Sequence, residues 1–600
     1  MIGWLALAGC RPEPVVPRAS PTIAFTADET AFEGDPAHAS ADLFGVVVGD
    51  LELDGDPDVI ISRHMLGPLE LFENDGTGRF VQLNRKDADA TGLYENPGVA
   101  DLFVVDVASE APGVYVWHDV SRSGPWRFRV ILDSAEPAVL VLRTNVEMTS
   151  PPELLETEFD QPGDTDAVVT LARSGDFSID TERFGSQLVV AVEGDDPLPL
   201  FVGSEGARFD REVSLLKSDP HGIAWVDAIG TPIPDLFVSR GALTGDLAPP
   251  FDPKIDRLYE HVGGATAFVE SWASHASYDR GRQVMWIDVD HDGTNELHVA
   301  NTTTPDHVLD PDAGFANRAS ELGLAAVGPD SIAWLDLDRD GSADLVHADG
   351  AALGVSMYRD GVYVEEPGAG RGLAWDVAFD EELFDPAVFR VADFDRDGDL
   401  DLCLVEVGEG RIWAFRAEGD GLVDATDALG LGGATGFEEI LPLDVDNDGW
   451  TDLIAASAEP VLWHNRGGRF EAVALGVAAG ANAAVADVDG DGLADVVFAT
   501  AGARGLLRNE TVDAWPAAVV TPVAPLGTVV RGHYFSGDVL AQSWGQAQVT
   551  RYHQGLLPLR FGSPGHDPLV GLSLQCPGCP APTVELDASG SPTCTPCPDR

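Results

Sequence analysis

Six short segments of this chain each bring four acidic residues together at a fixed spacing. Each follows the pattern Asp-x-Asp-x-Asp-Gly-x-x-Asp, with Glu in place of one Asp in two copies. If the chain turns tightly, the carboxylates at positions one, three and five converge, and Gly at position six tolerates the positive φ that such a turn requires. The acid at position nine closes the shell. The result is a cage of hard oxygen ligands, which Ca²⁺ prefers at about 2.3–2.6 Å.

We number these segments as loops I to VI. The expected ligands are Asp50, Glu52, Asp54 and Asp58 in loop I; Asp288, Asp290, Asp292 and Glu296 in loop II; Asp336, Asp338, Asp340 and Asp344 in loop III; Asp393, Asp395, Asp397 and Asp401 in loop IV; Asp444, Asp446, Asp448 and Asp452 in loop V; and Asp487, Asp489, Asp491 and Asp495 in loop VI. Without a cation, the repulsion within each loop costs several kcal/mol even at an effective dielectric of about 20. We therefore expect calcium to stabilise the fold directly.

An EF-hand is the main alternative for such acidic loops. It requires a bidentate Glu at position twelve and a helix on each side. Position twelve in the six loops holds Ile61, Val299, His347, Leu404, Ala455 and Phe498, none of which is acidic. The flanking residues, such as 284–287 and 496–499, are apolar runs typical of strands. Each loop is therefore predicted to join two strands.

The loops belong to a repeat whose neighbouring copies from loop II onward start between 43 and 57 residues apart. That period is typical of a four-stranded propeller blade. Weaker acidic copies occur near Asp106, between residues 156 and 166, near Glu193, and from Asp227 to Asp235, and these are interpreted as blades without metal. The predicted fold class is all-β, a single β-propeller of about seven blades. Ten candidate motifs leave open a larger propeller, such as one of eight blades, or weak copies that are not blades.

The Asp loops resemble the FG-GAP or VCBS repeats of integrin alpha-chain propellers. Segments 314–324 and 421–431, which end in Leu-Gly-Leu, resemble those of the cartilage acidic protein group and its bacterial relatives. The resemblance implies a propeller of about seven blades with calcium held by the same four acids of each loop. In that group a small β domain follows the propeller, and residues 526–531 and 559–562 resemble two of its strands.

The expected domains follow from these patterns. They are a lipoprotein signal over 1–10, a proline-rich tether over 11–24, the propeller over 25–512, a small β domain over 513–575 and a cysteine-rich tail over 576–600. The apolar run ending in Leu7-Ala-Gly-Cys10 resembles a bacterial lipoprotein signal, in which Cys10 receives lipid. No Lys or Arg precedes that run, so a chance cysteine in an apolar terminus is the alternative. The expected location is the bacterial cell envelope, with export and a lipid anchor.

The remaining cysteines divide into two groups. Cys403 lies in an apolar strand and is expected to be a buried, inert thiol. The last four, Cys576, Cys579, Cys594 and Cys597, form two Cys-x-x-Cys pairs. They allow either two disulfides, which suit an exported protein, or a Cys₄ zinc site.

The net charge and the motifs of the chain limit the classes of function that it can have. A formal charge of −64 argues against nucleic acid and anionic lipid surfaces as partners, and contact with membrane is expected only through the N-terminal lipid. The sequence contains no nucleophile elbow, zinc-protease helix or phosphate loop. We therefore expect a binding module rather than an enzyme. Its ligand is an extracellular or envelope protein or a polysaccharide, bound on the loop face or in the central channel. A carbohydrate-active lyase or hydrolase is the alternative.

Overall fold

A computed structural model of the 600-residue chain shows the fold. The structure describes residues 21–33, 43–82 apart from 52–53 and 64–68, ten short strands between 102 and 204, and 220–586 apart from 229–233, 241–255, 262–267, 275–280, 302–303, 326–330, 350–351, 374–386, 407, 477–481, 501–502, 521–528, 535, 544–553, 556, 564–566, 568 and 576–583. Within these residues, three short helical turns stand among the strands: α2 (Ala319–Leu322), η3 (Gly368–Arg371) and α3 (Thr426–Leu429).

The fold is all-β, and its main unit is an antiparallel sheet of four strands in chain order. Seven such sheets occur in the described part of the chain, and the first carries β2 as a fifth strand. Their strands are β3 (Leu43–Gly49), β4 (Asp58–Arg63), β5 (Glu70–Asn74), β6 (Phe80–Gln82) and β2 (Phe32–Glu33); β17 (Pro220–Val226), β18 (Asp235–Arg240), β19 (Arg257–His261) and β20 (Phe268–Ala273); β21 (Gly281–Ile287), β22 (Glu296–Asn301), β23 (His307–Asp310) and β24 (Ala316–Asn317); β25 (Ser331–Leu335), β26 (Asp344–Asp349), β27 (Ala352–Arg359) and β28 (Val362–Pro367); β29 (Ala387–Ala392), β30 (Asp401–Glu406), β31 (Ile412–Glu418) and β32 (Gly421–Asp424); β33 (Glu439–Leu443), β34 (Asp452–Ala456), β35 (Val461–Asn465) and β36 (Phe470–Ala474); and β37 (Asn482–Ala486), β38 (Asp495–Thr500), β39 (Ala503–Asn509) and β1 (Phe25–Asp28).

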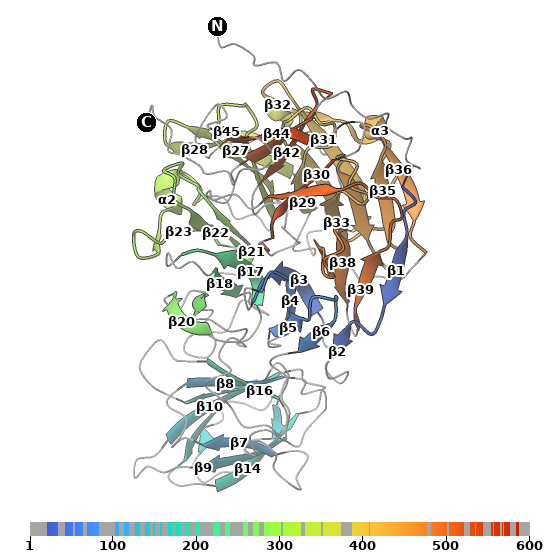
Figure 1. The fold of residues 1–600 in the computed structure, drawn as a ribbon. Helices are drawn as coiled ribbons and strands as arrows, with labels where there is room; N and C mark the ends of the chain where they lie inside the picture. Colours follow the sequence, from blue (N-terminus) through green and yellow to red (C-terminus); the bar gives the residue numbers. More distant parts are fainter. Residues whose placement is uncertain are drawn as a thin grey trace.

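The seven sheets are arranged as a ring (Figure 1). The first strand of each sheet contacts the first strand of the next, in the cyclic order β3, β17, β21, β25, β29, β33, β37 and back to β3. Strand β1 pairs antiparallel with β39, so the beginning of the described chain completes the last sheet. This pairing joins the two ends of the ring. The predicted propeller fold is confirmed, and the sheet of β17–β20 shows that the weak copy from Asp227 to Asp235 is a blade.

Three strands on the inner side of their sheets are buried along their whole length, although each also contains polar residues such as Arg282 and Asp401. Every residue of β21, β30 and β34 is buried, because these strands have neighbouring sheets on both faces. The outer strands β28 and β36 are mostly exposed and bury one aromatic residue each, Tyr363 and Phe470. Clusters such as the one that contains Val346, Val355, Phe389 and Leu404 fill the space between adjacent sheets. Burial of each such side chain contributes about 1.5–3 kcal/mol.

The segment between β6 and β17 departs from the prediction. Its strands are β7 (Leu102–Asp106), β8 (Gly113–His118), β9 (Trp126–Ile131), β10 (Ala138–Thr144), β11 (Met148–Ser150), β12 (Thr157–Glu158), β13 (Asp166–Leu171), β14 (Gly175–Thr181), β15 (Gln187–Val192) and β16 (Leu200–Ser204). They form two sheets, of orders β12-β13-β10-β15-β8-β16 and β11-β14-β9-β7, with parallel pairs β7–β9 and β8–β16. Figure 1 places these strands apart from the ring. The weak acidic copies near Asp106, from 156 to 166 and near Glu193 are therefore not blades, because a blade pairs consecutive strands.

A smaller β unit follows the ring. It contains β40 (Ala517–Val520), β41 (Val529–Tyr534), β42 (Val539–Ser543), β43 (Leu559–Gly562), β44 (Leu569–Gln575) and β45 (Val584–Leu586). These strands form a sheet of order β42-β41-β44-β45 and a separate pair β40–β43. Residues 559–562 form a strand, as the sequence predicted. Strand β41 begins at Val529 and so overlaps only the end of the predicted segment 526–531, of which 526–528 lie outside the described residues. The closeness to the cartilage acidic protein group stays a prediction.

Candidate metal centres

All six Asp loops connect the first and second strands of a sheet. In every loop the acid at position one accepts a hydrogen bond from the backbone N–H of the Gly at position six, over 2.8–3.1 Å. The six glycines have φ between 78° and 103°, the left-handed region that the sequence predicted. The tight turn is therefore built as expected in each loop. The glycines are Gly55, Gly293, Gly341, Gly398, Gly449 and Gly492.

The acid at position nine ties the loop to its sheet. In loop V, Asp452 accepts hydrogen bonds from Val445 N–H at 2.9 Å and from Asn465 N–H on the third strand at 2.6 Å. Loops I, III, IV and VI repeat this pair of bonds. In loop II, Glu296 makes the first bond, to Val289 N–H at 2.8 Å. The position-nine acid thus holds both ends of the loop and the third strand together.

In loops II to VI, position four also takes the left-handed conformation, which the sequence analysis did not predict. His291, Arg339, Arg396 and Asn447 have φ between 57° and 61°, and Gly490 has φ 71°. A non-glycine residue rarely adopts this conformation unless its surroundings demand it. The Asn and Gly at this position in loops V and VI were the available signal, since both tolerate positive φ.

The acids converge as a cation site requires. In loops II, III and IV, one oxygen from each of the acids at positions one, three and nine lies within 4.8 Å of the other two. In loop V the acids at positions one, three and five do so. Four of the buried carboxylate oxygens have no hydrogen-bond partner in the part of the chain that the structure describes: Asp338 Oδ1, Asp395 Oδ1, Asp446 Oδ1 and Asp487 Oδ1. A buried anion without a partner is costly, and a cation would satisfy it. The residues present therefore fit Ca²⁺.

Electrostatics lead to the same conclusion. Burial first, with a contribution from the neighbouring acids, raises the pKa of Asp288 to about 7 and that of Glu296 to about 9. The same causes raise the pKa of Asp344 to about 7 and that of Asp393 to about 8. Carboxyl groups with such pKa values hold protons near neutral pH unless a positive charge replaces them. A divalent cation supplies that charge.

Arginine side chains neutralise the outer side of several loops. The acid at position three forms an ion pair with an arginine in loops II, III, IV and VI, at N–O distances of 2.6–3.3 Å. The pairs are Asp290–Arg318, Asp338–Arg359, Asp395–Arg416 and Asp489–Arg508. In loops III and IV the arginine binds Oδ2 of this acid, whereas Oδ1 is the unpartnered oxygen. Each of these carboxylates therefore keeps one oxygen for a cation.

The unit that follows the ring lies against loops IV, V and VI. Ala541 N–H donates to Asp393 at 2.8 Å, Trp515 N–H donates to Asp446 O at 2.9 Å, and the Arg560 guanidinium forms an ion pair with Asp487. These contacts cover part of the face that loops IV, V and VI form. No local sequence pattern predicts contacts such as Ala541–Asp393 and Arg560–Asp487, which join residues 148 and 73 positions apart.

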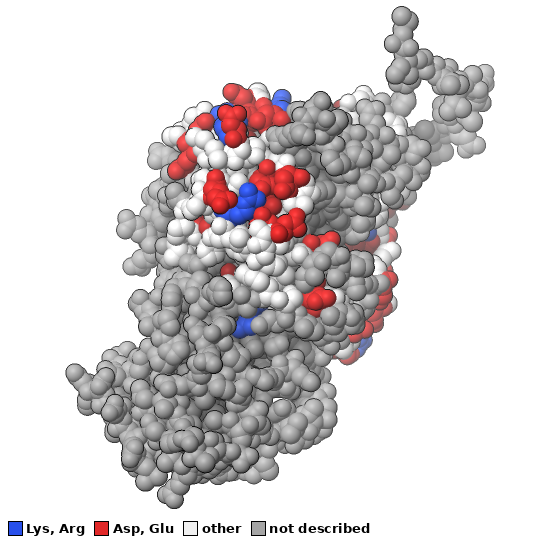
Figure 2. Space-filling model, turned by 90° about the vertical axis from the view of Figure 1, so that its left-hand side faces the viewer, with Lys and Arg blue, Asp and Glu red and all other residues white. Residues whose placement is uncertain are grey.

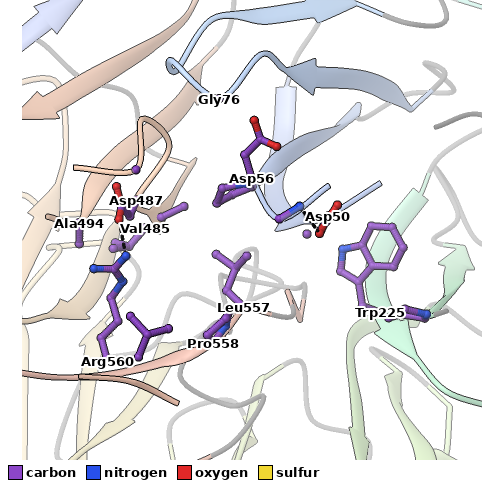
Figure 3. Close-up of a pocket in the computed structure, with 17 residues that line it drawn as sticks. Asp50, Asp56, Gly76, Trp225, Val485, Asp487, Ala494, Leu557, Pro558 and Arg560 are labelled. Atoms are coloured by element: carbon purple, nitrogen blue, oxygen red, sulfur yellow. Dashed lines mark hydrogen bonds and ion pairs between the residues drawn. The ribbon is translucent and has the colours of Figure 1, made fainter. Parts of the chain in front are cut away.

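A cavity of about 450 Å³ lies between loops I and VI. Figure 3 shows Arg560 reaching Asp487 on one side of the cavity, Trp225 on the other, and Leu557 and Pro558 between them. Asp50 and Asp56 of loop I also line it. The cavity therefore combines apolar walls with charged groups from two Asp loops.

Acidic side chains also mark the exterior. Figure 2 shows Asp and Glu gathered around a few Arg on the face that it displays. This distribution matches the formal charge of −64 and disfavours anionic partners.

Several predicted residues lie outside the described residues: Glu52 of loop I, Cys10, and Cys576, Cys579, Cys594 and Cys597. Their lipid, disulfide or zinc roles stay predictions. Cys403 is fully buried with a free thiol, and burial raises its pKa, as expected of an inert core residue. Among the described residues, no helix is long and apolar enough to cross a membrane.

Comparison with known families addresses the repeat directly. The family model for the FG-GAP-like repeat matches residues 393–455 and 444–498, which contain loops IV, V and VI. The chain contains FG-GAP-like repeats. Loops I, II and III share the hydrogen bonds of these repeats, although the matches do not include them.

Solved structures give weaker similarities. A lectin of Agrocybe aegerita, described as recognising non-reducing terminal N-acetylglucosamine, is 16% identical with a TM-score of 0.32, and the alignment covers 48% of this chain and 80% of the lectin. Sqt1 of Saccharomyces cerevisiae is 12% identical with a TM-score of 0.31, over 55% of this chain and 87% of Sqt1. Similarities at this level carry no functional argument. No curated protein matches the sequence.

Proposed function

We propose that this chain is an exported, calcium-loaded β-propeller that binds a ligand of the bacterial cell envelope, and that it is not an enzyme. The observation that carries the proposal is the set of buried carboxylate oxygens in the Asp loops that have no hydrogen-bond partner among the described residues. Calcium, when bound, supplies positive charge and hard coordination by the loop acids. The propeller is then a rigid frame for recognition rather than a set of flexible acidic turns.

The contacts of the loops connect calcium binding to the rest of the molecule. Asp393 accepts a hydrogen bond from Ala541, and Asp487 binds Arg560. A cation that fixes loop VI therefore also fixes Asp487 and Arg560, which border the cavity. We expect ligand binding to require calcium for this reason.

The cavity between loops I and VI is the proposed ligand site. Its volume of about 450 Å³ lies within the range of about 300–1,000 Å³ that small ligands occupy. The ring of Trp225 and the side chain of Leu557 offer apolar walls, while Asp50 and Asp56 offer hydrogen-bond acceptors. A sugar ring has an apolar face that can pack on these walls and hydroxyl groups that can donate to these carboxylates. We therefore favour a sugar unit of a polysaccharide over a protein ligand. Lipid attachment at Cys10 would hold the protein at the envelope.

The test is a glycan array probed with the full mature chain, in excess calcium and again in excess chelator. We expect calcium-dependent binding that weakens in Asp56→Asn, whereas Asp420→Asn, on an exposed turn, serves as the matched control. If no glycan binds in calcium and an envelope protein is captured instead, the ligand is a protein rather than a polysaccharide. The absence of both would refute the binding role.

One observation favours a second candidate, a carbohydrate-active hydrolase or lyase. Burial and a hydrogen bond with Asp54 raise the pKa of Asp56 to about 6, whereas the hydrogen bond with Asp56 lowers the pKa of Asp54. A carboxyl group with a raised pKa can act as a general acid, and Asp56 lines the cavity, while Asp54 remains a calcium ligand of loop I. Polysaccharide turnover that Asp56→Asn abolishes would establish this function, and the lack of turnover would contradict it.

A further inference from the structure

Loop V differs from its neighbours at one position on the third strand. In loops IV and VI, the position-nine acid accepts a hydrogen bond from the N–H of Ala417 or Asn509 on the third strand. The residue before each is an arginine, Arg416 or Arg508. Each pairs with the position-three acid of its loop. In loop V the equivalent residue is His464, which precedes Asn465. Histidine thus takes the place that arginine fills in the two neighbouring loops.

The imidazole of His464 faces two acids of loop V without hydrogen-bonding to either. His464 is 1% exposed, and its Nε2 lies 3.5 Å from Asp446 Oδ2 and 3.9 Å from Asp452 Oδ1. These distances exceed the length of an ordinary N–H···O bond. Within the described residues, neither ring nitrogen of His464 has a hydrogen-bond partner, and neither has Asp446 Oδ1. A buried, unpartnered imidazole is therefore aimed at two buried carboxylates.

The three side chains have the spacing of metal ligands. One ligand atom from each of Asp446, Asp452 and His464 lies within 4.8 Å of the other two, and all three residues are buried. Two donors held at about 2.1 Å from a tetrahedral ion lie about 3.4 Å apart. The observed separations of 3.5 and 3.9 Å are close to that value. The group is therefore compact enough to close on one small ion with little movement.

We propose that Asp446, Asp452 and His464 form a mixed nitrogen–oxygen site that prefers a zinc-class transition-metal dication to Ca²⁺. Imidazole nitrogen is a good ligand for Zn²⁺ and Co²⁺, whereas Ca²⁺ selects oxygen donors. Asp444 and Asp448 lie beside Asp446 and can complete the shell. The other Asp loops remain calcium centres, so one ring would carry two classes of metal. This inference goes beyond the proposed binding role and does not depend on the identity of its ligand.

The opposing interpretation is that a protonated His464 acts as the cation partner of Asp446, as arginine does in loops IV and VI. The two interpretations predict different results for the variant His464→Arg. If His464 is only a cation, arginine preserves its role and metal binding does not change. If His464 is a ligand, arginine removes the transition metal while the protein stays folded.

The experiment titrates the full chain with Co²⁺ in excess calcium, which fills the oxygen-only loops. We expect about one Co²⁺ per chain with visible ligand-field absorption and without the intense near-ultraviolet charge-transfer band that cysteine ligation produces. His464→Gln and His464→Arg should weaken this binding at least about tenfold, the low end of the loss seen even for outer-shell partners. The matched control is His533→Gln, in a strand outside the loops.

Circular dichroism and the melting temperature establish that each variant is folded. If His464→Gln fails to fold, His464→Arg carries the test, since it restores the pattern of the neighbouring loops. The proposal is overturned if the wild-type chain binds no Co²⁺ in excess calcium. It is also overturned if both His464 variants bind Co²⁺ as tightly as the wild type.

Discussion

Removal of calcium should make the stability of this protein fall as the pH rises. The perturbation is an excess of chelator at pH 5 and at pH 8. Without a cation, burial first and the nearby carboxylates in addition raise the pKa of Asp344 to about 7 and that of Glu296 to about 9, from ordinary values of 3.8 and 4.5. A carboxyl with a raised pKa is neutral in the folded protein at pH 5. It must lose its proton, at a cost, as the pH rises.

The sign of the effect follows from proton binding. Above about pH 4 the unfolded chain has released these protons, whereas the folded protein retains them until about pH 7. The folded state therefore binds more protons in this window, and the free energy of unfolding falls as the pH rises through it. For Asp344, the rise from 3.8 to about 7 corresponds to about 4 kcal/mol, at about 1.4 kcal/mol per pKa unit. Four kcal/mol is a large part of the roughly 5–15 kcal/mol that stabilises a typical domain.

The assay is thermal unfolding by calorimetry, with chelator and with calcium, at pH 5, 6, 7 and 8. In chelator the melting temperature should fall by at least about 5 °C between pH 5 and pH 8. In calcium this loss should be largely reversed, because the ionised acids bind the cation. Calcium should therefore stabilise the protein more at pH 8 than at pH 5. Equal melting temperatures at pH 5 and pH 8 in chelator would refute the reasoning, and so would a calcium effect that does not change with pH.

Three further predictions concern single side chains. Gly293 has φ 97°, and open space surrounds the position of an added methyl group. Gly293→Ala should therefore lower the free energy of unfolding by about 1–3 kcal/mol through backbone strain alone. Denaturant unfolding in calcium measures this, and an unchanged midpoint would contradict the required turn. Arg560→Ala removes the ion pair with Asp487 and a 2.9 Å hydrogen bond to Gly492 O. Limited proteolysis should therefore cut residues 515–575 faster than in the wild type. An identical cleavage rate would show that this contact does not hold the unit on the ring. Cys403 is fully buried, so it should resist alkylation in the native protein and react only on unfolding. Peptide mapping by mass spectrometry follows the modification. Alkylation in native buffer would contradict its position in the core.

Local sequence patterns predicted the parts of this fold that local interactions determine. The acid at position one, the Gly at position six and the acid at position nine bond within one loop and its sheet, and the sequence located all six loops. The paired hydrogen bonds of Asp452, to Val445 and Asn465, join residues only 7 and 13 positions apart. Such interactions repeat with the sequence pattern and can be recognised from it.

The rest of the fold depends on contacts between distant residues. The order of strands β7–β16 is set by parallel and non-consecutive pairings, which alternation of apolar residues cannot specify. The hydrogen bond between Gln554 and Trp286 joins residues 268 positions apart. The contacts of the β40–β45 unit with loops IV to VI also join residues far apart in the sequence. His464 was missed for a related reason. It lies outside the Asp pattern and approaches Asp446 only because β35 pairs with β34.

The most direct test of the account is the number of calcium ions bound per chain. The full chain, dialysed against trace calcium, is assayed by elemental analysis beside variants in which the position-one acid of a single loop becomes Asn, such as Asp336→Asn and Asp393→Asn. We expect several calcium ions per chain and the loss of about one ion in each variant. A wild-type chain with no calcium above that of the dialysis buffer, or variants that retain the full number, would contradict it.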